Sequence, residues 1–471
     1  MTHGKTAALA ALLIAAACAP QEQTAAAAGD AVLFHDVRVL DFSGDAPEAR
    51  EHMSVLVRGG TVETVAAVND LKAPAGAQVI EGAGRTLLPG LVDMHVHIWD
   101  QAELGAYLSY GVTTVRNASG MPFLLEMRDA IDAGELTGPR IVTTGPILNS
   151  TGPNAQLNHQ IVDTADAARA AVQAQYDAGY RRLKVYSNLT REAYDAIHAE
   201  AQRLGMTVMG HTPEGVRDPG IPFQKPFRIA FEELLDDGFV TIEHMESVVW
   251  HGLYDDFDED KARDLARKVA ASGTAVDPTL LAHRNLTLDA ATKGEYASRP
   301  GVDTLNPFVF SLEGAQRDRW AGEDAERAQR ADDFYARATK IFHEEGVTLV
   351  TGTDAGIFIN IPGASLIDEL ELMHGAGLTP VEVLRAATVN AATVLDEAGR
   401  FGRIASGQRA DMVLTDGDPL TDLDVLRNPA GVMHAGAWLD ADALAALRAG
   451  AANTDFERSE TNIMAAMAAQ Q

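Results

Sequence analysis

The sequence of 471 residues predicts an α/β protein: a (β/α)8 TIM barrel with a small β-sandwich domain formed from both chain ends. Two observations lead to this prediction. Eight short apolar segments alternate with stretches of helical periodicity between residues 89 and 401. Segments of alternating polarity, separated by glycine-containing turns, flank that region at 31–88 and 402–440. No internal repeat of about 20–50 residues occurs, so a solenoid is not indicated.

The first residues differ in composition from the rest. A short positive start, MTHGK, precedes the apolar run TAALAALLIAAA, which is too short for a stable membrane anchor. Cys18 follows at once, and the arrangement resembles a bacterial lipoprotein signal, in which this cysteine carries lipid. We expect residues 1–18 to be a signal peptide and 19–30 a tether, giving an exported bacterial protein in the periplasm or anchored to the outer membrane. A chance cysteine in a signal peptide cut elsewhere is the alternative.

The net charge limits the classes of partner that the protein can bind, and the cysteine content limits the disulfide bonds that it can form. The sequence has 38 basic and 67 acidic residues, a formal net charge of −29. Nucleic acid binding requires a basic surface, so this balance argues against it, and the simplest role of the charge is to keep molecules apart in solution. With a single cysteine, the sequence offers no internal disulfide.

The β segments at the two ends share one pattern. VLFHDVRVLDF, SVLVRGGTVETVAAV and QVIEGAGRTLLPG alternate apolar and polar residues around glycine turns. GRIASGQRADMVLTD and GVMHAGAWL do the same near the other end. We expect these segments to form one composite domain, followed by a helical tail at 441–471.

The barrel strands are predicted from apolar runs, most of them separated by helical stretches such as REAYDAIHAEAQRLG. In chain order, the predicted strands are Gly90–His97, Gly111–Ser119, Arg140–Leu148, Arg181–Ser187, Met206–Thr212, Phe239–Glu246, Thr274–Leu280 and Val347–Gly356. The active site of such a barrel lies at the carboxyl ends of its strands.

Residues of metal-ligand type occur at those strand ends. In LLPGLVDMHVHIWD, alternation places His95 and His97 on one face of the first strand, which is costly unless something binds both imidazoles. The further candidates are Lys184 on the fourth strand, His211 on the fifth, His244 on the sixth and Asp354 on the eighth. Taken singly, each has an ordinary explanation, such as a hydrogen-bonded core histidine or a capping aspartate. Six such residues at one barrel mouth predict a metal site.

These motifs resemble those of the amidohydrolase superfamily of metal-dependent hydrolases. The resemblance covers nearly the whole mature chain and rests on PGLVDMHVH, GVTTVR, MGHT, IEHME, TGTDAG and ATVNAATVLDEAGRFGRIASGQRADMVLTDGDPL. It implies an enzyme of the branch that contains Xaa-Pro dipeptidases and imidazolonepropionases. The split β domain is also common in that family.

The resemblance further implies a binuclear zinc centre. The two first-strand histidines and Asp354 would hold one Zn²⁺, while His211 and His244 would hold the other; manganese or cobalt could replace zinc. Lys184, carboxylated by CO2, would bridge the two ions, because a protonated lysine cannot ligate a cation. Mononuclear deaminases of the superfamily usually lack this lysine, which favours a hydrolase. A shared water of pKa near about 7 would supply the metal-bridging hydroxide, and Asp354 would pass its proton to the leaving amine.

The substrate is less directly indicated. Candidates for substrate contacts are Arg116 and Asn117 at the end of the second strand, Asn158 and His159 in the loop after the third, and Tyr186 at the end of the fourth. Each of them also has a structural alternative. Many related dipeptidases have a Gly-Gly-His turn after the third strand, where this chain has ILNSTGPNAQLNHQ. The long stretch between the seventh and eighth strands, with Tyr296, Phe308, Phe310 and Trp320, forms either a cap over the site or an ordinary helical elaboration.

We therefore expect an exported hydrolase of C–N bonds in small substrates such as dipeptides or N-acyl amino acids. The same binuclear site would also suit lactones, carbamates or phosphoesters. A deaminase and an inactive binding protein are the remaining alternatives. We expect no nucleic acid partner, and we expect contact with a membrane only through the N-terminal lipid.

Overall fold

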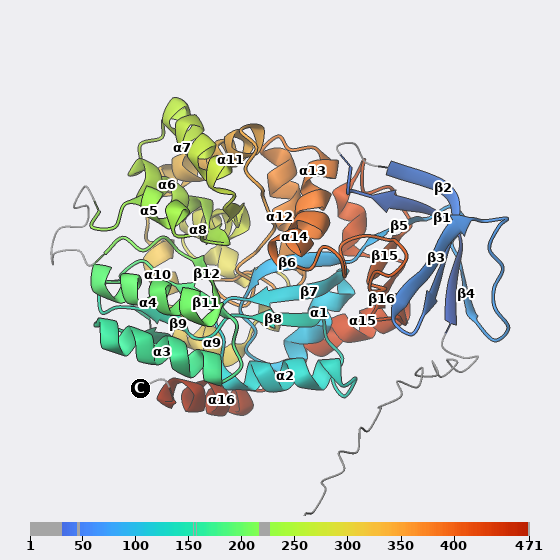
Figure 1. Ribbon diagram of the computed structural model, residues 1–471, viewed down its shortest axis with the longest axis horizontal. Coiled ribbons are helices and arrows are strands. Elements are labelled where there is room, and N and C mark those ends of the chain that lie inside the picture. Colours follow the sequence, from blue (N-terminus) through green and yellow to red (C-terminus); the bar gives the residue numbers. More distant parts are fainter. Residues whose placement is uncertain (1–30, 45–47, 154, 157, 216–226, 470–471) are drawn as a thin grey trace, which may run out of the picture.

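The computed structural model describes residues 31–44, 48–153, 155–156, 158–215 and 227–469. The predicted signal peptide, the tether and Cys18 lie outside the described residues. Within the described ranges, no helix is both long and apolar enough to cross a membrane. Figure 1 shows a β-sheet at one side of the molecule, next to a larger body of helices and parallel strands.

Both ends of the chain contribute to one sheet, as their alternating patterns predict. Its strands are β1 (Ala31–Asp41), β2 (Glu48–Arg58), β3 (Thr61–Ala67), β4 (Gln78–Glu81), β5 (Thr86–Pro89), β15 (Met412–Thr415), β16 (Gly431–His434) and β17 (Ala437–Asp440). The strands from the N-terminal part and those from the C-terminal part of the chain meet where β5 pairs antiparallel with β15, with Leu88 opposite Val413. The strand order is β17–β16–β15–β5–β1–β2–β3, with β4 also paired to β1. Instead of two separate sheets there is one connected sheet, because β1 pairs with β4 through residues 32–35 and with β5 through 38–39.

Two parallel sheets carry the predicted barrel strands. The first consists of β6 (Leu91–Val96), β7 (Val112–Asn117) and β8 (Arg140–Thr143). The second has the order β10–β9–β11–β12–β13–β14 and consists of β9 (Ile147–Asn149), β10 (His159–Ile161), β11 (Arg182–Val185), β12 (Thr207–Gly210), β13 (Thr241–Glu243) and β14 (Ala275–Asp277). Strand and helix alternate along the chain, and the parallel pairing is consistent with a barrel.

Two of the eight predicted strands are irregular. The third is divided into β8 and β9, because the chain changes partner from β7 to β11 there and Gly145 N donates to Arg182 O between them. The eighth segment pairs with β14 and with β6 only through isolated bridges. Its backbone turns to a positive φ of 58° at Asp354, which interrupts regular pairing beside the predicted site.

Helices cover the parallel strands on their outer side (Figure 1). They are α1 (Leu104–Ser109), α2 (Pro122–Asp132), α3 (Ala165–Asp177), α4 (Arg191–Leu204), α5 (Phe231–Asp236), α6 (Met245–Leu253), α7 (Glu259–Ser272), α8 (Leu280–Thr292), α9 (Pro307–Leu312), α10 (Gly314–Ala321), α11 (Ala325–Glu344), α12 (Ala364–Gly375), α13 (Pro380–Arg385), α14 (Ala391–Val394), α15 (Ala441–Gly450) and α16 (Phe456–Ala468). The predicted stretch REAYDAIHAEAQRLG forms α4. The Thr190 hydroxyl accepts from Ala193 N at its start, and Gly205 ends it in the left-handed conformation.

Candidate metal centre

Four of the predicted ligands lie together in one group. Asp354 Oδ1 lies 2.9 Å from His97 Nε2 and 3.3 Å from His95 Nε2. Lys184 Nζ lies 2.8 Å from the same His95 nitrogen. All four side chains are buried. Donors from β6, β11 and the eighth segment thus meet at the strand ends, where the sequence pattern places them.

The other two predicted ligands lie beside this group. The ring centroid of His244 is 4.7 Å from that of His95 and 4.4 Å from that of His211. Ligand atoms of His95, His244 and Asp354 all lie within 4.8 Å of one another. The six side chains therefore form one continuous cluster.

Three of the histidines are oriented by a second partner. His95 Nδ1 lies 2.7 Å from Glu243, His97 Nδ1 lies 2.8 Å from Ser119 Oγ, and His244 Nδ1 lies 2.6 Å from Thr279 Oγ1. Metal-binding histidines characteristically use one ring nitrogen in this way, which fixes the ring and directs the other nitrogen to the ion. The sequence analysis did not single out these three supporting residues. Glu243 directly precedes His244, and this position next to a predicted ligand is the feature of the sequence that could have identified it.

The donor set fits divalent metal. His211 Nδ1 is buried and has no hydrogen-bond partner among the described residues, although buried polar atoms are nearly always paired. A metal ion held by that nitrogen would satisfy it. Imidazole and carboxylate donors together are the set preferred by zinc and its first-row neighbours.

The protonation states also suit ligands. Burial lowers the pKa of His244 to about 4 and holds the pKa values of His95 and His211 well below the ordinary value. Burial alone would raise the pKa of Asp354, but the hydrogen bond with His97 and the neighbouring histidines bring it well below its usual range. Neutral imidazoles and an ionised carboxylate are the forms that bind metal. Burial also lowers the pKa of Lys184 to about 8, against the opposing carboxylates of Asp354 and Glu243.

The backbone at two predicted ligands is strained. His244 has a φ of 68° and Asp354 a φ of 58°, in the left-handed region that non-glycine residues seldom adopt. Such strain concentrates at functional sites. Close packing next to Asp354 requires glycine: a Cβ on Gly352 would lie 2.6 Å from His95 Cβ and 2.1 Å from Asp277 Oδ2.

Arg116, a predicted substrate contact, serves a different purpose. Its guanidinium is buried and donates to Met94 O, Thr241 Oγ1 and Glu243 Oε1 at 2.6–2.8 Å. It does not line the cavity described below. The placement favours the structural alternative: Arg116 neutralises Glu243 inside the strands and thereby supports the carboxylate that orients His95. Asn117 is likewise internal, accepting from Ile98 N and donating to Thr143 Oγ1.

We predict that Arg116→Met destabilises the protein by about 3–5 kcal/mol, because it leaves the buried carboxylate of Glu243 without its counter-charge. The measurement is the urea midpoint of unfolding. Arg169→Met is the matched control, since Arg169 forms a surface pair with Asp166 worth about 0.2–1 kcal/mol. Equal midpoints for the two variants would contradict the structural role of Arg116.

A cavity of about 1300 Å³ opens onto the cluster, and His97, Lys184, His211, His244 and Asp354 all line it. The predicted contacts Asn158, His159 and Tyr186 line it too. The Tyr186 ring lies 3.9 Å from the His211 ring and 4.5 Å from the His159 ring, centroid to centroid. The long connection α8–α11 supplies the facing wall, including Trp320 of α10. That connection therefore contributes to the lining of the site through Trp320, whereas Tyr296, Phe308 and Phe310 do not line the cavity.

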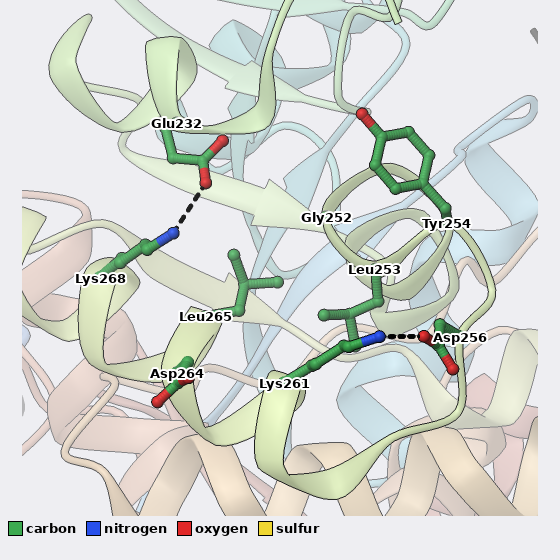
Figure 2. Close-up of a pocket in the computed structure, with 9 residues that line it drawn as sticks. All are labelled: Glu232, Gly252, Leu253, Tyr254, Asp256, Lys261, Asp264, Leu265 and Lys268. Carbon is green, nitrogen blue, oxygen red and sulfur yellow. Dashed lines mark hydrogen bonds and ion pairs between the residues drawn. The ribbon is translucent and has the colours of Figure 1, made fainter. Parts of the chain in front are cut away.

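A smaller pocket of about 340 Å³ lies between α6 and α7 (Figure 2). In it, Lys268 pairs with Glu232 at 2.9 Å and Lys261 pairs with Asp256. Because its lysines are already paired and it contains none of the predicted ligands, the larger cavity is the candidate active site.

Comparison with known proteins assigns the family. The model of the amidohydrolase family matches residues 86–439, most of the chain. The chain belongs to the amidohydrolase family. This membership makes the protein a hydrolase and confirms the superfamily resemblance seen in the sequence.

Amidohydrolase-family proteins of several activities are similar to this one. Ochratoxinase from Aspergillus niger is 32% identical over 400 residues, 74% of each chain. A solved Xaa-Pro dipeptidase with bound methionine aligns with a TM-score of 0.67 at 22% identity, covering 87% of this chain and 100% of the other. Bottromycin amidohydrolase aligns with a TM-score of 0.70 at 25% identity, covering 90% and 91% of the two chains.

Proposed function

We propose that this amidohydrolase-family enzyme cleaves amide bonds in small substrates, such as dipeptides or N-acyl amino acids, at a binuclear metal centre. The observation that carries the proposal is the junction of a buried cluster of six ligand-type side chains with a cavity of substrate size. The family and the similarity to bottromycin amidohydrolase support an amide as the bond that is cleaved.

Each cluster residue has a proposed role. His95 of β6, His97 directly after that strand and Asp354 would hold one ion, His211 and His244 would hold the other, and a carboxylated Lys184 would bridge them. When bound, two zinc ions polarise the scissile carbonyl and lower the pKa of the attacking water to about 7. Oδ1 of Asp354 faces the imidazoles of His95 and His97, so we assign Oδ2 to accept the proton of the attacking water and deliver it to the leaving nitrogen.

The remaining polar groups of the cavity would position the substrate. The Tyr186 hydroxyl accepts from Gln156 Nε2 at 3.3 Å, and among the described residues no acceptor is seen for its own proton, which could therefore be donated to a substrate oxygen. His159 is neutral, since burial lowers its pKa to about 3, and it lies against Tyr186. We propose that these two side chains bind the carboxylate or carbonyl of the substrate.

We also propose that the two parallel sheets are arcs of one closed barrel. Backbone hydrogen bonds from Gly145 N to Arg182 O and from Met94 N to Thr351 O support this. The first links the segment after β8 to β11 of the other sheet, and the second links β6 to the eighth segment, which otherwise pairs only through isolated bridges. Closure would hold the six ligands on one rigid ring of strand ends.

A substrate panel tests the reaction. Zinc-loaded enzyme is assayed on dipeptides, N-acyl amino acids, lactones and aryl phosphates, with His244→Ala as the control for contaminating activity. We expect amides to be cleaved with a kcat/KM at least about 10²-fold above the lactones and phosphates, and His244→Ala to lose that activity. If the enzyme turned over only lactones or phosphates, the proposed cleavage of amide bonds would be wrong. Two bound metals without any turnover would indicate a binding protein.

Export with lipid attachment is proposed on the charged start, the apolar run and Cys18. The full-length chain and Cys18→Ala are expressed in a Gram-negative bacterium with a labelled fatty acid. The parent should carry label and sediment with membranes, whereas Cys18→Ala should carry none. An unlabelled, soluble parent would refute the lipid anchor, and its location inside or outside the cytoplasm would then decide export separately.

A further inference from the structure

Helix α16 brings apolar side chains into the active-site cavity. Ile463 and Met467 lie one helical turn apart on one face, and both line the cavity that also contains Lys184 and His244. Ile463 is buried, and Met467 is half-buried against the main core. Met464 on another face of the same helix is 50% exposed and does not line the cavity. One face of α16 is thus part of the site, although the helix lies more than 100 residues beyond Asp354 in sequence.

An ion pair with a buried aspartate anchors this helix. Arg458 donates from Nε and Nη2 to the two oxygens of Asp100, both at 2.8 Å, and Asp100 is 1% exposed. A bidentate arginine–carboxylate pair fixes orientation as well as position. Asn306 next to α9 adds a second attachment by donating to Ser459 Oγ at 2.8 Å. The helix is therefore held in one orientation and is not a loose appendage.

The ion pair between Arg458 and Asp100 lies close to the cluster of predicted ligands. Asp100 and Glu103 follow the first barrel strand, and Glu103 accepts from Trp99 N at 3.2 Å. The Trp99 indole lies nearly parallel to the imidazole of His97, at 12° and 6.1 Å between centroids, and donates to Gly356 O at 3.0 Å. The segment that contains the predicted ligand His97 thus also holds α16 in place through Asp100.

We infer that α16 is a substrate-selecting wall, with Met467 contacting an apolar acyl group distal to the scissile amide. The inference rests on the proposed function and deepens it by naming the substrate class. Apolar residues of α9 and α10 (Val309, Leu312 and Trp320) line the same cavity as Met467. The cavity also exceeds the roughly 300–1,000 Å³ usual for small-molecule sites, so it has room beyond a dipeptide. An extended acyl chain matches this lining, and a flexible thioether suits contact with it.

Two substrates with the same amide and amino acid test the wall, N-acetyl- and N-decanoyl-glycine. The quantity measured is the ratio of kcat/KM for the decanoyl to that for the acetyl substrate. We expect Met467→Ala to lower this ratio about three- to tenfold and Met464→Ala, a matched methionine on the exposed face, to leave it at the parent value. Equal ratios in all three proteins would overturn the inference.

Binding of decanoate, measured by calorimetry on the metal-loaded protein, separates this inference from the proposed function. Met467→Ala should weaken decanoate about three- to tenfold while retaining the parent metal content, and Met464→Ala should not weaken it. If the parent cleaves neither substrate but this binding pattern appears, amide hydrolysis fails and the wall stands. If amides are cleaved and decanoate binds all three proteins equally, the wall fails and the proposed function stands.

Discussion

Replacing Lys184 with alanine is expected to lower bound metal below two ions per chain and to reduce kcat by about 10³-fold or more. Lys184 Nζ lies 2.8 Å from His95 Nε2, inside the buried cluster, so a carbamate on Lys184 would lie among the predicted ligands of the metal centre. Removing a bridging ligand forfeits several kcal/mol of charge stabilisation in the transition state, and each 1.36 kcal/mol corresponds to about tenfold in rate. Metal content is read by elemental analysis and kcat by amide turnover.

Two further measurements make the Lys184 prediction specific. Acetate or propionate should partly restore Lys184→Ala, because a small carboxylate replaces the carbamate oxygens. Protein exchanged with ¹³C-bicarbonate should show a carbamate carbon signal that Lys184→Ala lacks. Lys268→Ala is the control, since Lys268 is exposed and pairs with Glu232 outside the cavity that contains the cluster. Two tightly bound ions and full turnover in Lys184→Ala would refute the bridge and revive the deaminase alternative.

Replacing Asp354 with asparagine is expected to lower kcat by about 10²–10⁴-fold, the range for general acid–base assistance. Asparagine can occupy the left-handed backbone of this position, so the fold should tolerate it. Its amide oxygen can still face His97 Nε2, as Asp354 Oδ1 does at 2.9 Å, and coordinate weakly. What asparagine cannot do is accept and return a proton. The loss of kcat should therefore exceed the loss of metal.

Comparison with His97→Ala provides the control for Asp354→Asn. His97→Ala removes a predicted ligand outright and should lose metal and activity together. Asp354→Asn should keep more metal than His97→Ala while its kcat is still at least about 10²-fold below the parent. An Asp354→Asn protein that retains metal and turns over amides at the parent rate would assign the proton transfer to another group of the cavity, such as His159 or Tyr186.

The positions of the six cluster residues could be predicted because each depends on local pattern. A strand of period two followed by a polar residue places that residue at the strand end, and parallel strands bring their ends together. His95, Lys184 and His244 meet for this reason although they are far apart in sequence. The order of strands and helices was predictable on the same grounds.

The features that the sequence did not reveal depend on partners remote in the chain. Arg116 resembles a substrate contact until Thr241 and Glu243, more than 120 residues later, are seen to accept from its guanidinium. The third strand divides because the chain changes from one neighbour to another, a property of the sheet and not of its residues. Periodicity indicates a helix at the chain end, but only the cavity lining by Ile463 and Met467 shows that α16 reaches the active site.

The measurement that tests the central claim most directly is a titration of metal-free enzyme with Zn²⁺, with bound metal and amide turnover followed together. A binuclear centre predicts no turnover without metal, two ions bound per chain, and maximal kcat only when the second ion is bound. Asp354→Asn should follow the parent in metal bound per chain more closely than in turnover. Full activity in metal-free protein, or maximal activity with one ion per chain, would contradict the binuclear hydrolase.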